Sequence, residues 1–169
     1  ANSRGVERRI AHQAFEERLP VEIHGRQWER FAANALVRGP GMANAEVADL
    51  YRRSVVLNDH WADMRANGIL SNRLFDAAAC AAPVISDDIQ GLQDTFSGLV
   101  AAWRPGQALA PLVRAAVTED AEARARRLAL AQEVMSVHSF AARAREIVAV
   151  ARRELARLAG EPTRRERAD

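Results

Sequence analysis

The amino-acid sequence predicts an α/β fold with a doubly wound parallel sheet. Two short β-branched apolar runs, VVLND at residues 55–59 and PVISD at 83–87, bracket a helical segment that begins near Ser71. Strand and helix patterns also alternate along most of the chain, which is typical of parallel strands joined by right-handed crossovers. In such folds ligands bind at the carboxyl ends of the strands, so the functional residues are expected there.

The individual elements follow from hydrophobic periodicity and from the positions of glycine and proline. Apolar residues recur at helical spacing from Val6 to Leu19, and Pro20 ends that helix. Strands are expected at residues 21–25, 35–41, 55–59, 83–87 and 98–103. Further helices are expected at 44–53, from Ser71 through the Ala-rich stretch that precedes Pro83, and at 90–96, 107–118, 119–136 and 139–158.

The length of 169 residues and the hydrophobic content of 49% allow one good core, so one domain is predicted over residues 1–158, followed by a charged tail at 159–169. The chain opens with a loop and a helix, whereas a doubly wound half normally opens with a strand. A strand preceding residue 1 is therefore expected, the chain is expected to be part of a longer polypeptide, and the sheet should look incomplete beside VEIHG.

Composition excludes several function classes. All 24 basic residues are arginine, which excludes lysine-based catalysis within the chain, and they are interleaved with 22 acidic residues, which argues against a nucleic-acid face. The single cysteine, Cys80, permits no internal disulfide, and the four histidines show no metal-ligand spacing. No apolar run reaches membrane-spanning length and no signal peptide opens the chain, so a cytoplasmic domain without a membrane span is expected.

The helix after residue 70 carries one polar stripe, formed by Asn72, Arg73 and Asp76. The amides of a helix N-terminus and a guanidinium suit a diphosphate, and a carboxylate one turn further could accept hydrogen bonds from ribose hydroxyls. A plainer interpretation is also open: Ser71 or Asn72 is only an N-cap, and Arg73 and Asp76 form an ordinary surface pair.

Several motifs together resemble the carboxy-terminal, donor-binding half of GT-B glycosyltransferases. They are LND at 57–59, NRLFDAAAC at 72–80, APVISDD at 82–88 with GL after it, and VHSFAARAREI at 137–147. The opening NSRGVER and the later LPVEIHGRQW are similar to the glycosyltransferase group 1 branch that includes the spore-maturation-like proteins. The resemblance covers about residues 1–152 and implies a Rossmann-like half of a GT-B architecture.

The resemblance implies transfer of a sugar, of hexosyltransferase type, from a nucleotide-sugar donor, with no metal or other cofactor required. The family's ribose-binding glutamate falls on Asp76, its helix-start arginine on Arg73 and its strand-end asparagine on Asn58. Arg4 or Arg8 takes the place of the diphosphate-binding lysine of many relatives.

Two positions depart from the family pattern. Gly68 stands where many relatives place a second glutamate, so no carboxylate contact with the sugar is expected from that position. Ala81 stands where the family has glycine, and a left-handed backbone there would cost about 1 kcal/mol.

Two other candidates lie near predicted strand ends and have plain alternatives. His24 could face the ligand crevice or pack beside Trp28, and Arg38 lies where relatives form the base pocket or on a surface turn. His60 follows Asp59 at a strand end, where Asp59 could simply cap the next turn, and His138 is expected to be structural, just before a Ser139 helix cap.

These observations together predict a glycosyltransferase donor-binding domain, inactive as an isolated half, with an unknown acceptor and an unknown catalytic base. Its expected partners are the nucleotide-sugar and the amino-terminal, acceptor-binding half of the same polypeptide, without nucleic acid; an oligomer stays open. Two rivals stay open as well: half of a GT-B-like sugar-nucleotide epimerase, and a noncatalytic nucleotide-binding or interaction module. The predicted donor-binding residues are Arg4, His24, Arg38, Asn58, Ser71, Asn72, Arg73 and Asp76.

Overall fold

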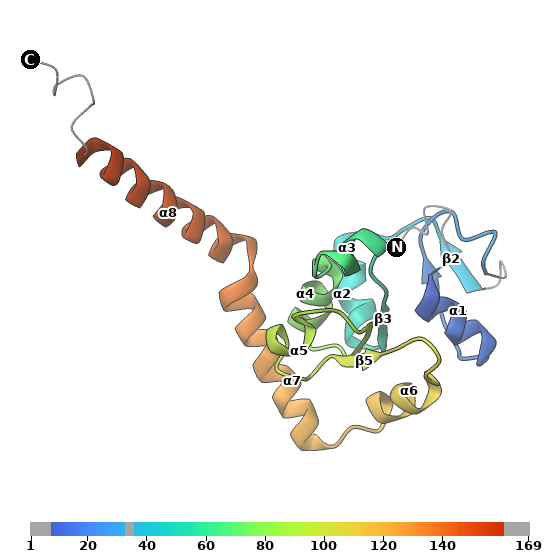
Figure 1. The fold of residues 1–169 in the computed structure, drawn as a ribbon. Helices are drawn as coiled ribbons and strands as arrows, with labels where there is room; N and C mark the ends of the chain where they lie inside the picture. The colour runs from blue at the N-terminus through green and yellow to red at the C-terminus, as the bar shows by residue number, and fades with distance from the viewer. Residues whose placement is uncertain (1–7, 33–35, 161–169) are drawn as a thin grey trace, which may run out of the picture. The chain divides into compact units, whose positions relative to one another are not determined.

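A computed structural model describes residues 8–32 and 36–160 of the chain. These residues group into two compact units that divide between Gln132 and Glu133. Parallel strands alternate with helices in the first unit, which confirms the predicted α/β fold (Figure 1). The second unit consists of helix alone within the described residues.

All five predicted strands form, each shorter than expected, and they divide into two parallel sheets. β1 (Ile23–His24) pairs with β2 (Val37–Gly39) in the first sheet. β3 (Val56–Asn58), β4 (Val84–Asp87) and β5 (Ala101–Trp103) form the second, with β4 in the centre. Among the strands of the described residues, β1 pairs only with β2 and β3 only with β4, so the expected continuous sheet is split in two.

The helices of the first unit follow the predicted order. They are α1 (Arg9–Glu16), α2 (Asn44–Arg52), α4 (Asn72–Ala79), α5 (Leu92–Thr95), α6 (Ala110–Val117) and α7 (Ala121–Glu133), which reaches the unit boundary. A further short helix, α3 (Ala62–Ala66), lies between β3 and α4, where the sequence pattern predicts no helix.

The core of the first unit forms around β4. All four residues of β4 are buried, so both faces of this strand are covered. On one face, Ile85 clusters with Ile10 and Ala14 of α1, with Trp103, and with Leu109 before α6. Helix α4 also contacts β3 and β4, and its Phe75 ring lies 5.1 Å from the Phe96 ring at the end of α5. Layers of helix therefore hold the carboxyl ends of β3 and β4 in place.

Glu17 joins the end of α1 to the beginning of α6. Its two carboxylate oxygens accept the backbone N–H groups of Leu109 and Ala110, each at 2.6 Å. These N–H groups belong to a helix start, where no intrahelical acceptor exists, so Glu17 caps α6 from another element. The bond from Leu109 is the main reason that the pKa of Glu17 lies below its ordinary value, with the Ala110 bond adding to the effect.

The end of α4 has the hydrogen bonds of a Schellman motif. The N–H of Ala82 donates to the carbonyl of Ala77 at 3.0 Å, and the N–H of Ala81 donates to that of Ala78 at 2.8 Å. Ala81 has a φ of 53°, in the left-handed region where glycine is favoured. A glycine would adopt this conformation without strain, whereas alanine occupies it at a cost.

In the second unit, a π-helical turn, η2 (Val134–His138), precedes the long helix α8 (Phe140–Gly160). The hydroxyl of Ser139 accepts the N–H of Ala142 at 3.2 Å, which confirms the predicted Ser139 cap. Arg143 donates to Nδ1 of His138 at 2.9 Å. Among the helices of residues 8–32 and 36–160, none has the length and apolarity needed to cross a bilayer.

Candidate functional site

Five polar residues are buried at the carboxyl ends of two neighbouring strands. Asn58, Asp59 and His60 end or follow β3, and Ser86 and Asp87 end β4. Buried charged groups are costly unless they are paired, so each requires partners within the fold. The partners come from α1, α3 and the start of α4, so two strands and three helices meet at this strand edge.

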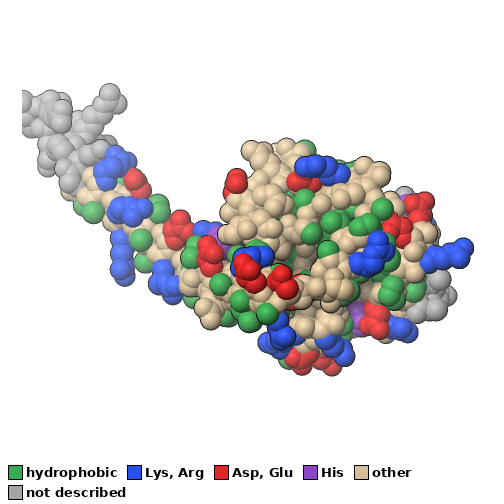
Figure 2. Space-filling view, turned by 90° about the horizontal axis from the view of Figure 1, so that it is seen from below, with side chains coloured by type: hydrophobic (Ala, Val, Ile, Leu, Met, Phe, Trp, Pro, Cys, Tyr) green, Lys and Arg blue, Asp and Glu red, His purple; other side chains and the backbone are tan. Residues whose placement is uncertain are grey.

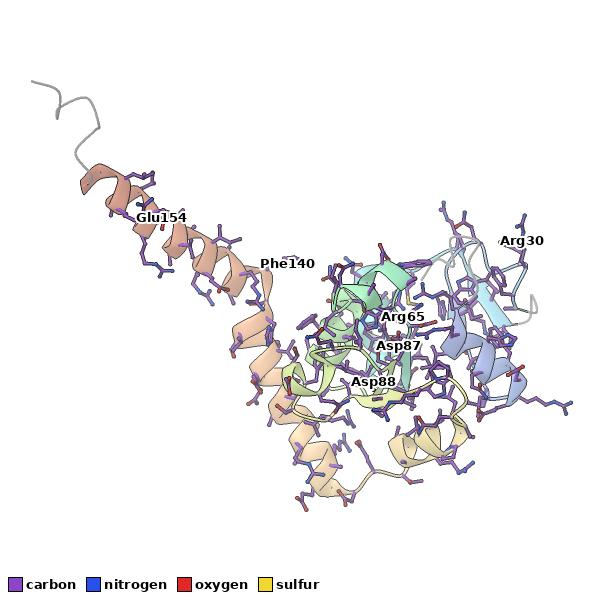
Figure 3. All side chains as sticks on the ribbon, in the orientation of Figure 1. Arg30, Arg65, Asp87, Asp88, Phe140 and Glu154 are labelled. Carbon is purple, nitrogen blue, oxygen red and sulfur yellow. The ribbon has the colours of Figure 1, made fainter. Side chains whose placement is uncertain are left out.

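Arg9 and Arg65 each bridge the two buried carboxylates. Arg9 lies 3.2 Å from Asp59 and 2.9 Å from Asp87, and Arg65 lies 3.4 Å and 3.6 Å from the same two carboxylates. Figure 3 labels Arg65 and Asp87, which lie in the same part of the first unit. Burial alone would raise the pKa of Asp87, but hydrogen bonds from His60 and the charge of Arg9 hold it below its ordinary value.

Arg8 brings a third guanidinium to this cluster. It lies 4.0 Å from Asp59 and stacks over the Trp61 ring at 4.0 Å from the ring centroid. Burial lowers the pKa of Arg8, Asp59 opposes this effect, and the neighbouring positive charge of Arg73 lowers the pKa further. Three guanidinium groups thus face two carboxylates, with Arg73 beside them, so positive charge is in excess at this edge.

The first residue before α4, Ser71, is bound to the end of β3 by two hydrogen bonds. Its hydroxyl donates to Oδ1 of Asn58 at 3.0 Å, and its N–H donates to Nε2 of His60 at 3.1 Å. Asn58 in turn donates to the hydroxyl of Ser86 at 3.0 Å. Within the described chain the Ser71 side chain makes no capping bond to its own helix. Ser71 is therefore the N-cap residue by position, as the plainer interpretation expects, but among the described residues its side chain does not cap the first turn of α4.

Arg73 and Asp76 lie on α4 close to Tyr51 of α2. Burial raises the pKa of Asp76, and the charge of Arg73 partly opposes this effect. Burial also raises the pKa of Tyr51, while the charge of Arg73 lowers it in part. The Asp76 side chain is exposed, whereas Arg73 is half-buried. Arg73 therefore lies where the α2–α4 contact meets the arginine cluster.

A pocket of about 550 Å³ opens next to the ends of β1 and β2. It is lined by His24, Arg38, Gly41, Met42, Glu46, Asp49 and Arg53. His24 and Arg38 both lie near Glu22, at 3.6 Å and 3.5 Å. Two predicted site residues from separate strands thus line one concave surface, with both signs of charge around it.

The predicted donor-binding residues fall into two groups. Asn58, Ser71, Arg73 and Asp76 lie at or near the β3 end and on α4, and Asn72 lies on the same helix with an exposed side chain. His24 and Arg38 line the pocket. Arg4 lies outside the described residues. Residues 8–32 and 36–160 contain no cluster of three or more His, Cys, Asp or Glu side chains that could hold a metal ion.

A family model described as glycosyl transferase-like matches residues 4–149, which is most of the chain. The chain belongs to this glycosyl transferase-like family. Searches of curated proteins and of solved structures return no match. The match spans the strands, α4 and the whole buried cluster, so the strand-end residues described above lie inside the glycosyl transferase-like domain.

Sequence reasoning missed most of the buried cluster in this glycosyl transferase-like domain. The motifs and their spacing do not indicate Arg9, Arg65 or Asp87 as site residues, and they mark Asp59 and His60 only as residues at a strand end. The sequence does contain one indication of this cluster, because two consecutive strand patterns each end in an acidic residue, Asp59 and Asp87. What the sequence lacks is the pairing, because Arg9 is separated from Asp59 by 50 positions and from Asp87 by 78.

Proposed function

We propose that this domain binds the nucleotide-sugar donor of a GT-B glycosyltransferase of the group 1, spore-maturation-like branch, and that the complete protein transfers the sugar, of hexosyl type, to an acceptor. The observation that carries the proposal is the uncapped start of α4 beside the arginine cluster. Free N–H groups and the positive end of a helix dipole favour an anion at this position.

A diphosphate is the anion that fits this site best. Arg8 and Arg73 place positive charge beside the start of α4, and the buried carboxylates are already matched by Arg9 and Arg65. Guanidinium groups bind phosphate oxygens in bidentate geometry. When the sugar leaves the donor, negative charge develops on the departing diphosphate, and donors fixed in advance would stabilise that charge.

The rest of the nucleotide would extend along the same edge of the domain. Asp76 lies one turn into α4 with an exposed carboxylate, where it could accept hydrogen bonds from ribose hydroxyls. The base would lie at the pocket lined by His24 and Arg38, whose side chains would supply polar groups to it. In this proposal Asn58 and Ser71 position α4 and do not touch the ligand, since each is already bonded within the protein.

In this proposal the complete protein also contains an amino-terminal half and a further strand of the sheet. A further parallel strand of the same polypeptide would pair with β1 or β3, each of which has one strand partner among the described residues. The acceptor site and any base that activates the acceptor would come from the other half. On the face drawn in Figure 2, acidic and basic side chains are interspersed, which supports a small anionic ligand over a nucleic acid.

Titration calorimetry of the complete protein with UDP, GDP and ADP, and with their sugar conjugates, tests the proposal. Asp76→Ala should weaken binding of the preferred nucleotide at least about tenfold, because charge-assisted bonds to the ribose are worth about 1.5 to 3 kcal/mol. Arg73→Ala should weaken it similarly and reduce its salt dependence, because an ion-to-ion contact is removed.

The matched controls are exposed residues of the same type on helices away from the strand ends, Asp94→Ala on α5 and Arg124→Ala on α7. Both should bind the nucleotide as the unmodified protein does. Thermal melts separate binding from folding. If Asp76→Ala binds every nucleotide sugar with unchanged affinity, the donor site is wrongly assigned. If the unmodified complete protein binds none of them, the result favours the alternative that the domain is a noncatalytic interaction module.

A further inference from the structure

His60 is a fully buried imidazole that joins three segments of the fold. Its Nδ1 lies 2.6 Å from Oδ1 of Asp87 at the end of β4, and its backbone N–H donates to the same oxygen at 3.0 Å. Its Nε2 lies 3.1 Å from the backbone nitrogen of Ser71. Both ring nitrogens are therefore engaged, one toward a strand end and the other toward the start of α4.

These contacts fix the tautomer of His60. A backbone N–H can only donate, so Nε2 must present its lone pair to Ser71. The ring proton therefore lies on Nδ1, from which it donates to the ionised carboxylate of Asp87. Asp87 is held in place in turn by Arg9 and Arg65, so the imidazole has a defined orientation.

We propose that His60 is a positioning residue of the donor site, which holds the first turn of α4, and Arg73 with it, by accepting the Ser71 N–H. The inference rests on the proposed diphosphate site at the start of α4. Ser71 directly precedes the helix and Arg73 is its second residue, so a shift of Ser71 moves the guanidinium with it. His60 accepts a hydrogen bond from the Ser71 N–H, and Asn58 accepts one from the Ser71 hydroxyl. Ser71 is therefore held by two hydrogen bonds, and its hydroxyl does not bond to the amides of the helix.

This role depends on a neutral ring. A proton on Nε2 would turn the acceptor for Ser71 into a second donor, and the two N–H groups would then oppose each other. The charged group that the structure brings against the imidazole is Asp87 on β4; Arg9 of α1 and Arg65 of α3 pair with that carboxylate, and Arg65 also donates to the backbone carbonyl of His60. A protonated ring would keep its contact with Asp87, whereas it would no longer accept the Ser71 N–H.

Two substitutions separate the two bonds of the ring. In His60→Gln the longer amide can present Oε1 near the position of Nε2, so the Ser71 N–H keeps an acceptor. In His60→Asn the shorter amide can still donate to Asp87 from near the position of Nδ1, but it does not reach Ser71. A structural role alone predicts similar nucleotide binding by these two variants once both are folded, whereas a positioning role predicts a difference between them.

The test has two readouts on the complete protein. Long-range ¹⁵N–¹H spectra at neutral pH should show His60 with its proton on Nδ1, and amide exchange should show the Ser71 N–H protected in the unmodified protein and in His60→Gln but fast in His60→Asn. Calorimetry with the preferred nucleoside diphosphate should show binding about tenfold weaker in His60→Asn and within about threefold in His60→Gln, at temperatures where melts show each variant folded.

The outcomes separate this inference from the proposed function. A proton on Nε2, or equal Ser71 protection in both variants, overturns the positioning role whether or not a nucleotide binds. Equal nucleotide affinity of the two folded variants also overturns it. If the predicted tautomer and protection are found but the unmodified protein binds no nucleoside diphosphate, the proposed donor site fails instead, and the positioning role for that site fails with it. Should the asparagine variant not fold, the tautomer of His60 and the Ser71 protection in His60→Gln decide: a proton on Nε2, or a fast-exchanging Ser71 N–H in His60→Gln, overturns the positioning role.

Discussion

Replacing Ala81 with glycine should stabilise the protein, although a helix end loses a methyl group. Ala81 has a φ of 53° directly after α4, and its N–H closes the Schellman motif on Ala78 at 2.8 Å. The Cβ of a residue in this region crowds the following carbonyl, at a cost of about 1 to 2 kcal/mol. The greater freedom of glycine in the unfolded chain offsets about 0.5 to 1 kcal/mol of this gain.

The net stabilisation expected for Ala81→Gly is therefore about 0.5 to 1 kcal/mol. For a protein of this length it corresponds to a rise in melting temperature of about 1 to 4 °C. Urea unfolding followed by circular dichroism measures the free energy directly, and an unchanged m-value would show that the unfolded state is the same.

The matched control is Ala115→Gly, in the middle of α6 with an exposed side chain. There the helical backbone has no strain to relieve, and glycine should cost about 1 kcal/mol. The two substitutions have the same chemistry and should have opposite signs. If Ala81→Gly destabilises the protein as much as Ala115→Gly does, the left-handed conformation at residue 81 is not the source of strain.

Two further predictions concern buried or capping carboxylates. Glu17→Gln should lower the free energy of unfolding by about 1 kcal/mol, because one of the two α6 N–H groups then faces an amide NH₂. Because folding lowers the pKa of Glu17, its contribution to stability is present above its ordinary pKa of 4.5 and is lost as the pH falls. The variant should therefore lose less stability in acid than the unmodified protein does. Asp87→Asn should lower the free energy of unfolding by about 3 kcal/mol at neutral pH, because Arg9 and Arg65 lose a buried counter-charge. Because folding also lowers the pKa of Asp87, the difference in stability between the variant and the unmodified protein should decrease as the pH falls below 3.8. Urea unfolding at several pH values measures this difference, and a constant difference would contradict the reasoning.

The sequence was sufficient for the order and type of most elements. Apolar runs such as VVLND and PVISD are too short and too β-branched for anything except buried strands, and both form β3 and β4. Helix α3 was missed because the stretch from His60 to Leu70 has no apolar period of its own. Its five residues are instead held between the strand end and α4, which is a tertiary effect that local pattern does not carry.

The candidate site was predictable only in part. The positions of Arg73 and Asp76 on α4 follow from helical spacing, and Ser71 was expected at the helix start. The burial of Asp59, His60 and Asp87 could not be predicted, because charged residues at strand ends are normally solvated and their burial here depends on arginines from α1 and α3. A local sequence pattern does not predict charge pairing between segments that are distant in the sequence.

The orientation of Ser71 connects the fold to the proposed function. A serine in this position commonly caps its helix, a contact worth about 1 kcal/mol, but here the hydroxyl donates to Asn58 and the helix amides are left without that partner. Departures of this kind from a local rule are typical of functional sites in natural proteins. A phosphate bound at the first turn of α4 would accept those N–H groups and the charges of Arg8 and Arg73 together, so nucleotide binding should stabilise the protein most at the helix start that its own side chains leave uncapped.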